Sequence, residues 1–372
     1  MKLTLDHAAL LKALAHVQSV VERRNTIPIL SNVKVEADSE ALRLTATDMD
    51  LDVSEATGAD VAKTGATTVP AHTLYEIVRK LPDGAQIEIE TASGGQQMVL
   101  RCGRSRFTLA SLPVEDFPVM TAGELPHAFR LSARDLCGLI DRTRFAISTE
   151  ETRYYLNGIY LHEIKHGGAD VLRAVATDGH RLASVEVPLP EGANGMPGVI
   201  VPRKTIAELR KLIDESDDQI EVGLSTTKIR FAAEKAVLTS KLIDGTFPDY
   251  ERVIPTGNDK TLDVACKAFS AAVDRVSAIS NDRSRAVKLA MTNGTLVLSA
   301  TSPDSGSATE ELEVNYRGEA LEIGFNSRYL LDITQQIGGE EARFSIADAA
   351  SPTILQERGD SGAIYVLMPM RV

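Results

Sequence analysis

Apolar and polar residues alternate on both sides of a short polar turn, and this pattern occurs three times along the chain. It is clearest at residues 174–187, where apolar positions flank Asp178 and Gly179. Alternation with a period of two is typical of strands, and Asp-Gly between two such runs favours a hairpin because Gly tolerates positive φ. The same phrase occurs at residues 44–56 and, in weaker form, from residue 298. The copies lie about 125 to 130 residues apart, which is the size of a domain.

Helical periodicity accompanies each copy. From about His7 to Val21, apolar residues recur at spacings of three and four, which predicts a helix with one apolar face. A second helix is predicted after Pro70, and it ends before the turn at residues 82–84. The two later units repeat the order helix, strands, helix, strands. The sequence therefore predicts an α+β chain of three repeated domains, each with two helices and antiparallel sheets.

The composition is that of an ordinary globular chain. It has 372 residues, 43% hydrophobic and 25% charged, with no Trp. No apolar run approaches the roughly 20 residues of a membrane span, and the first residues lack signal-peptide features, so we expect a cytoplasmic protein. Cys102, Cys137 and Cys266 are odd in number and far apart. We expect them to be buried and reduced, without metal spacing.

The net charge and the charge of the predicted helices point to different partners. A net charge of −12 argues against a nucleic-acid binder. However, the predicted helical spans hold 17 Lys and Arg against 8 Asp and Glu; these spans are 7–24, 71–81, 134–144, 203–213, 267–285 and 326–337. Two interpretations are open. The helices could form a basic surface for a polyanion, or Lys and Arg could simply be good helix formers on solvated faces.

Five motifs resemble one protein family. They are RYYLNGI (153–159), VATDGHRLA (175–183), VPRKTIAEL (201–209), FPDYERVIP (247–255) and YVLMPMRV (365–372). Together with the three repeats they resemble the bacterial DNA polymerase III beta subunits, the sliding clamps that act as DNA polymerase processivity factors. The resemblance covers the whole chain. It implies clamp domains at 1–121, 129–255 and 261–372, and a head-to-tail homodimer whose six domains close into a ring around duplex DNA.

The resemblance also implies the partners. A clamp is a processivity subunit with no catalytic site of its own, and no cofactor or metal is expected. It would tether the DNA polymerase III alpha subunit and serve as a docking platform for the clamp loader, other polymerases and repair proteins, which would bind through short linear motifs. The implied hydrophobic peptide pocket has two sides: Leu156, Thr177, Gly179, His180, Arg181, Leu182, Pro248, Arg252 and Val253 face Val366, Leu367, Met368, Pro369, Met370 and Arg371.

The chemistry of these residues suits a peptide pocket. Gly179 removes bulk at the turn, and the two Met provide a soft, polarizable wall that adapts to different ligands. Arg181, Arg252 and Arg371 could bond ligand carbonyls or carboxylates at the rim. The alternative interpretation is that residues 366–370 form only an edge strand at the end of the chain.

Two further surfaces follow from the resemblance. The DNA-facing residues would be Arg24, Arg79, Lys80, Tyr154, Tyr155, Arg203, Lys204, Arg210 and Lys211. Glu150 stands in the same loop where the family can carry a neutral amide. The dimer joint would bring the strand near 104–109, with Phe107 and Leu109, against a helix that carries Ala278 and Ile279.

Enzymatic alternatives have weaker support. His162 to His166 is a literal H-E-x-x-H, but a zinc site needs the two His one helical turn apart. The segment has the pattern of a strand, in which residues four apart lie about 13 Å from each other. Asp178, His180 and Arg181 could be an acid–base set, although a polar turn explains them as well. Three function classes remain: a DNA-encircling clamp, a metallohydrolase, and a structural oligomer that binds a polyanion or peptide.

Overall fold

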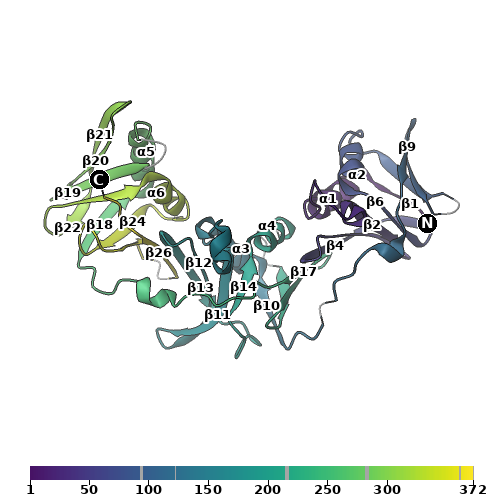
Figure 1. Ribbon diagram of the computed structural model, residues 1–372, viewed down its shortest axis with the longest axis horizontal. Helices are drawn as coiled ribbons and strands as arrows, with labels where there is room; N and C mark the ends of the chain where they lie inside the picture. The colour runs from purple at the N-terminus through teal and green to yellow at the C-terminus, as the bar shows by residue number, and fades with distance from the viewer. Residues whose placement is uncertain (93–94, 122, 214–217, 281–284, 360–361, 372) are drawn as a thin grey trace. The chain divides into compact units, whose positions relative to one another are not determined.

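The computed structural model describes residues 1–92, 95–121, 123–213, 218–280, 285–359 and 362–371. It divides into two compact units. Unit 1 comprises Met1–Cys137, Pro190–Pro197 and Lys204–Leu242; unit 2 comprises Gly138–Leu189, Gly198–Arg203 and Ile243–Val372. Figure 1 labels many of the helices and strands of both units.

Unit 1 contains two antiparallel sheets. The first has the order β5-β1-β7-β8-β9 and the second has the order β10-β15-β16-β17-β4-β3-β2-β6. The strands are β1 (Lys2–Asp6), β2 (Asn32–Ala37), β3 (Ala41–Thr47), β4 (Leu51–Gly58), β5 (Asp60–Lys63), β6 (Gly65–Pro70), β7 (Gln86–Thr91), β8 (Gln97–Cys102), β9 (Ser105–Ala110), β10 (His127–Ser132), β15 (Gln219–Leu224), β16 (Lys228–Ala232) and β17 (Ala236–Lys241).

Helices cover these sheets. Helices α1 (His7–Val17) and α2 (Ala71–Val78) lie side by side (Figure 1), and α1 packs on β3 and β4. The Asp6 carboxylate caps α1 by accepting from the Ala8 and Ala9 amides. Helix α3 (Ala133–Asp141) begins where the Ser132 hydroxyl accepts from the Asp135 amide, and α4 (Arg203–Leu212) begins within the motif at 201–209.

Unit 2 also contains two antiparallel sheets, and helices α5 (Cys266–Ser277) and α6 (Ser327–Thr334) pack against each other. The sheet orders are β14-β11-β12-β13-β26-β25-β24-β18-β22 and β21-β20-β19-β23. The strands are β11 (Gly158–His166), β12 (Ala169–Thr177), β13 (Arg181–Pro188), β14 (Val199–Pro202), β18 (Lys260–Ala265), β19 (Ala286–Thr292), β20 (Thr295–Ser302), β21 (Gly306–Glu313), β22 (Asn315–Arg317), β23 (Leu321–Asn326), β24 (Glu341–Ile346), β25 (Thr353–Glu357) and β26 (Ala363–Leu367).

One topology is used three times. The four-strand series β1-β7-β8-β9 recurs as β10-β15-β16-β17 and as β18-β24-β25-β26. A second series, β6-β2-β3-β4, recurs as β14-β11-β12-β13 and as β23-β19-β20-β21. The three polar turns of the sequence repeat are the hairpins β3–β4, β12–β13 and β20–β21. The predicted α+β class and its three repeats are therefore confirmed.

The helices are shorter than predicted, and this changes their charge. Helix α1 ends at Val17 rather than near Val21, and α5 ends at Ser277; residues 281–284, part of the predicted span, lie outside the described residues. The six helices of the described chain hold only nine Lys and Arg against six Asp and Glu. Arg79 and Lys80 lie directly after α2, and Arg23 and Arg24 lie six and seven residues after the end of α1. The excess positive charge of the predicted spans therefore lies mainly in the segments that follow the helices.

The cysteine and membrane expectations can be compared with the structure. All three thiols are buried and free. Among the described residues, no helix is both long and apolar enough to cross a bilayer.

Candidate functional site

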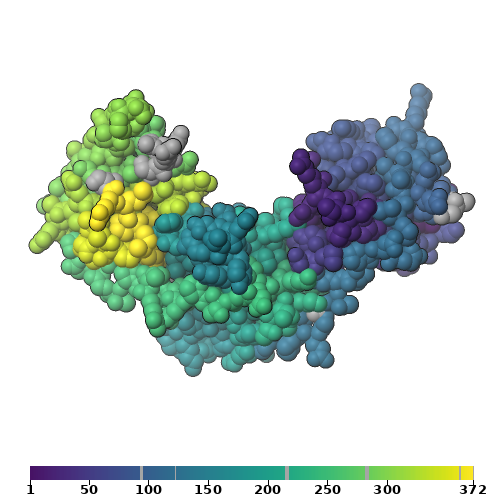
Figure 2. Space-filling view, in the orientation of Figure 1, coloured from purple at the N-terminus to yellow at the C-terminus, as the bar shows by residue number. Residues whose placement is uncertain are grey.

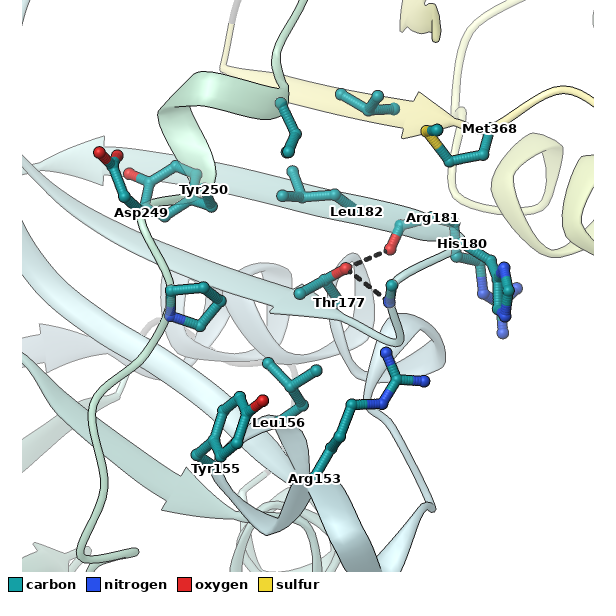
Figure 3. Close-up of a pocket in the computed structure, with 14 residues that line it drawn as sticks. Arg153, Tyr155, Leu156, Thr177, His180, Arg181, Leu182, Asp249, Tyr250 and Met368 are labelled. Carbon is teal, nitrogen blue, oxygen red and sulfur yellow. Dashed lines mark hydrogen bonds between the residues drawn. The ribbon is translucent and has the colours of Figure 1, made fainter.

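A cavity of about 330 Å³ lies on one face of the nine-stranded sheet in unit 2 (Figure 3). Its walls come from the β12–β13 turn, from the segment before β11, from the end of β26, and from the 3₁₀ turn at Tyr250–Val253. It is lined by Arg153, Tyr155, Leu156, Thr177, Gly179, His180, Arg181, Leu182, Pro248, Asp249, Tyr250, Val253, Val366 and Met368.

The β12–β13 turn is held by its own polar side chains. The Asp178 carboxylate accepts from the His180 amide at 2.9 Å and from the Arg181 amide at 3.1 Å. The Thr177 hydroxyl accepts from the Gly179 amide and donates to the Arg181 carbonyl (Figure 3). Gly179 has φ +87°, and a Cβ there would lie 2.5 Å from Arg153 Nη1. The positive φ favours glycine, and a larger residue would have to push the Arg153 side chain aside.

The Arg181 side chain connects the β12–β13 turn to α6. Its side chain is buried, and its guanidinium donates to Asp178, to the Asp332 carboxylate of α6 at 2.6 Å and to the Phe145 carbonyl at 2.6 Å. It also lies 4.3 Å from the centre of the Tyr329 ring. The expectation that Arg181 bonds ligands at the rim does not fit this geometry, because the guanidinium is already held inside the unit.

The floor of the cavity is apolar. Leu156, Val175, Leu182 and Val366 belong to one buried cluster, which also includes Tyr250. The Tyr250 hydroxyl bonds to His162 Nε2 at 2.9 Å and accepts from Arg173 Nη1 at 3.0 Å. Burial raises the pKa of Tyr250 above its usual value, so this phenol stays neutral near pH 7. An apolar floor with a few oriented polar groups is typical of a ligand pocket.

After β26, the C-terminal segment bonds first to the β12–β13 turn and then to β23. Met368 is 41% exposed, and its amide donates to the His180 carbonyl at 2.9 Å. Two residues later, the Met370 amide donates to the Gly324 carbonyl at 2.8 Å, which joins the chain to β23. Leu367, the last residue of β26, is buried, whereas Met368, which follows it, is exposed. Figure 2 shows the C-terminal residues, in yellow, at the surface of unit 2.

The structure brings together most, but not all, of the predicted pocket residues. Those that line the cavity are Leu156, Thr177, Gly179, His180, Arg181, Leu182, Pro248, Val253, Val366 and Met368. Those that do not line it are Arg252, Leu367, Pro369, Met370 and Arg371. Arg252 is exposed and pairs with Asp249 instead.

Four residues that line the cavity were not predicted as pocket residues: Arg153, Tyr155, Asp249 and Tyr250. Asp249 and Tyr250 could have been found, because they directly follow Pro248, which was predicted.

The loop before β11 departs from its predicted orientation. Tyr154 is 53% exposed, whereas Tyr155, also expected to face DNA, lies on the cavity wall instead (Figure 3). Glu150 accepts two hydrogen bonds from Arg153, at 2.7 and 2.8 Å. These bonds hold the pKa of the Glu150 carboxyl below its usual value. Glu150 therefore acts here as a partner that orients Arg153 at the rim of the cavity.

The predicted DNA-facing cations fall into two groups. Arg24 and Arg203 are exposed and have no ion-pair partner in the described chain. The others are engaged within the protein. Lys204 donates to the Val20 carbonyl and pairs with Asp48 at 2.5 Å. Likewise, Arg79 and Lys80 pair with Glu76, Lys211 pairs with Glu208, and Arg210 donates to the Ile213 carbonyl.

The dimer residues lie at two different places. Phe107 and Leu109 are on β9, the edge strand of its sheet. Ala278 and Ile279 are not inside a helix as predicted: α5 ends at Ser277, Ala278 is its C-cap, and Ile279 follows. Helix α5 packs on β20 and on β21, which is an edge strand of the other sheet.

The H-E-x-x-H segment is a strand. His162 and His166 lie on β11, where His162 bonds to Tyr250 and His166 pairs with Glu186 at 2.6 Å. Burial lowers the pKa of His162, which keeps its imidazole neutral. Within the described residues no group of three or more His, Cys, Asp or Glu is arranged to hold a metal. The strand geometry is incompatible with a zincin helix.

Comparisons with known proteins cover the whole chain. Three family models match in order: the N-terminal domain of the DNA polymerase III beta subunit at residues 1–121, its central domain at 130–249 and its C-terminal domain at 251–371. The beta sliding clamp of Caulobacter vibrioides is 55% identical over 372 residues and covers all of both chains. The beta sliding clamp of Escherichia coli K12 is 37% identical over 373 residues, again over the full length of both.

Solved structures agree. The sliding clamp of Bartonella birtlesii bound to griselimycin has a TM-score of 0.96 at 52% identity over all of both chains. That of Pseudomonas aeruginosa bound to griselimycin has a TM-score of 0.95 at 41% identity, with the same coverage. With three domain matches in order and full-length relatives well above 30% identity, the chain belongs to the DNA polymerase III beta subunit family, the beta sliding clamps.

Proposed function

We propose that this protein is a cytoplasmic, non-catalytic processivity clamp. Two copies join head to tail into a ring that encircles duplex DNA, with clamp domains at 1–121, 129–255 and 261–372. The ring tethers the DNA polymerase III alpha subunit. It is opened by a clamp loader, and it also receives other polymerases and repair proteins. The membership of the family supports this proposal at the level of the whole chain.

The repeated strand topology is the observation that best supports the proposed ring. Two internal junctions join the strand series: β4 pairs with β17, and β13 pairs with β26. The equivalent strands that remain are β21 and β9, and each is a sheet edge without a partner in the described chain. An unpaired edge is a template for another strand. Since β9 and β21 occur on every copy, pairing between copies would repeat the internal junction in both joints of a dimer.

Charge supports this pairing. Arg106 lies on β9 and Arg104 lies in the turn just before it, while β21 carries Glu311 and Glu313; none of these four has an ion-pair partner among the described residues. Opposite charges at the two edges favour the head-to-tail joint over the pairing of like edges. Ala278 and Ile279, next to β21 at the end of α5, would contact the apolar Phe107 and Leu109.

The cavity of unit 2 would bind the partner peptides. Its apolar floor would bury a Leu or aromatic side chain, worth about 1.5–3 kcal/mol per anchor. Arg153, Thr177, His180 and the backbone near Met368 would orient the peptide main chain. Two relatives were solved with griselimycin bound, and we propose that griselimycin binds this chain in the same cavity.

Topology provides the deciding experiment. The protein is loaded onto nicked circular DNA with clamp loader and ATP, and the complex is isolated by gel filtration. We expect retention on the circle and loss after a single restriction cut, because a ring slides off a free end. A protein that stays equally well on circular and linear DNA binds by direct contact, and this result would contradict the encircling function.

A further inference from the structure

The wall of the peptide cavity is backed by a chain of buried polar groups that is not part of the cavity itself. The ring of Tyr250 lines the cavity, but its hydroxyl points away, to His162 and Arg173. Tyr250, His162 and Arg173 are 5%, 9% and 6% exposed. Polar groups at this depth are costly unless they are satisfied, so their arrangement is constrained.

The hydrogen bonds have one consistent direction. Arg173 Nη1 can only donate, so the Tyr250 oxygen accepts from it. The Tyr250 hydroxyl hydrogen is then free to bond His162 Nε2 as acceptor at 2.9 Å. The His162 Nδ1–H is left to donate to the Glu163 carbonyl at 3.1 Å. This order requires a neutral His162, and it fixes the Tyr250 ring in one orientation.

Arg173 is held in turn by two carboxylates. Its Nε and Nη2 donate to Glu186 Oε2 at 3.1 and 2.9 Å, and its Nη1 also reaches Glu251 Oε1 at 3.2 Å. Glu251 and Tyr250 belong to the same 3₁₀ turn, Tyr250–Val253. Arg173 therefore ties this turn at two successive residues to strand β12. The turn in question forms one wall of the cavity, through Tyr250 and Val253.

We propose that Arg173 and His162 are positioning residues for the peptide cavity: they hold Tyr250, and with it the Tyr250–Val253 turn, at the width that receives an apolar anchor. The inference rests on the proposed peptide-binding function of this cavity. Neither residue touches the ligand. Their effect on affinity passes through Tyr250, because a wall held in place before binding costs less to order when the ligand arrives.

The test measures griselimycin affinity by calorimetry on the full chain. Tyr250→Phe keeps the ring that lines the cavity and removes only the hydroxyl. We expect about three- to tenfold weaker binding, the effect of losing buried hydrogen bonds. Tyr316→Phe is the matched control: Tyr316 is also 5% exposed, and its hydroxyl donates to the Glu319 carbonyl away from the cavity. It should lose similar thermal stability but bind griselimycin as the unaltered chain does.

A double-mutant cycle separates positioning from general destabilisation. Arg173→Lys and His162→Gln should each weaken binding on their own. In the Tyr250→Phe background His162→Gln should weaken it no further, because it acts through that hydroxyl, and Arg173→Lys should add only the smaller loss that passes through its bond to Glu251. Additive losses, or unchanged affinity in Tyr250→Phe, would overturn the inference while leaving the cavity function intact. If griselimycin does not bind the unaltered chain at all, the proposed cavity function fails, and the inference fails with it.

Discussion

At the residue scale, the conformation of single side chains decides whether the cavity exists. The same turn occurs at Thr47–Asp48, where Met49 occupies the positive-φ position at +76°. A non-glycine residue is therefore tolerated by the turn itself. At Gly179 an added Cβ would have to displace the nearby Arg153 guanidinium. The glycine of the second repeat is thus explained by the cavity rather than by the hairpin alone.

Gly179→Ala should weaken peptide binding beyond its cost in stability. The new Cβ would displace Arg153 from the rim, and the positive φ costs about 1–2 kcal/mol. Gly294→Ala is the control, because Gly294 has φ +81° in a hairpin turn with nothing within 4 Å of the added Cβ. Both variants should show a lower Tm. Only Gly179→Ala should lose affinity for griselimycin; equal affinities would contradict the role assigned to Arg153 at the rim.

Asp263 provides a pH-dependent contribution to stability. On β18 it is 6% exposed and accepts two hydrogen bonds from Arg343 of β24, at 2.7 and 2.8 Å. These bonds lower the pKa of Asp263 in the folded state. A carboxyl whose pKa is lower in the folded state stabilises the fold at pH values above its pKa in the unfolded chain. This stabilisation is lost as the pH falls through the pKa of the folded state.

Asp263→Asn should therefore lower the free energy of unfolding by about 1–2 kcal/mol at pH 7, and the difference should shrink on acidification below pH 4. Urea unfolding at several pH values measures it. Glu90→Gln serves as the control, because Glu90 and Arg101 form an exposed pair that should matter little. A gap that stayed constant from pH 7 to pH 3 would show that the ion pair is not its source.

At the element scale, the two internal junctions specify the register of the joint between copies. Leu51 begins β4 and pairs with Ser240; Arg181 begins β13 and pairs with Leu367, the last residue of β26. The equivalent residues at the free edges are the first of β21, Gly306, and the last of β9, Ala110. Carried over unchanged, this antiparallel register puts Thr108 of one copy opposite Ala308 of the next.

Thr108→Cys together with Ala308→Cys should form a covalent dimer under mild oxidation. Residues directly opposite in an antiparallel pair meet the Cα spacing of a disulfide. Non-reducing electrophoresis detects the product, and the three native thiols are buried and should not interfere. Thr108→Cys with Leu312→Cys is the control, since it places the thiols about 13 Å apart along the strand. Efficient cross-linking of the control instead would mean a different register.

At the scale of the whole molecule, the net negative charge of the protein repels the negatively charged DNA that a clamp encircles. The net charge of −12 opposes DNA at long range, although salt screens it beyond about 8–10 Å. Short-range attraction then depends on cations that are not already paired. Among the predicted DNA-facing Lys and Arg, Arg24 and Arg203 are the two without a partner in the described part of the chain, so they are the most readily available to phosphates.

Arg24→Glu and Arg203→Glu should each weaken DNA binding and reduce the log–log salt slope by about one. Affinity measured between 50 and 200 mM salt gives the slope. Arg252→Glu makes the same change of charge at an exposed arginine outside the predicted DNA surface, and it should leave the slope unchanged. If all three variants behave alike, net charge rather than local contact governs DNA binding.

The amino-acid pattern alone was sufficient for the architecture, because hydrophobic periodicity and turn residues act locally. It predicted the three repeats, the hairpin at Asp178-Gly179 and the α+β class. It also led to the family, since five motifs keep their order along the chain. It overestimated the helices, because apolar residues at helical spacing, such as Val20 and Val21, are buried in the segment after α1 as well as in the helix.

Only the tertiary structure could separate residues of the same type by their partners. Arg181, Lys204 and Arg203 are all cations in the sequence, yet Arg181 and Lys204 pair with carboxylates of this chain, whereas Arg203 has no ion-pair partner among the described residues. Likewise, Tyr154 is exposed whereas Tyr155 lines the cavity. The free energy of a charged or aromatic side chain depends on neighbours brought from distant parts of the chain, and local pattern carries no record of them.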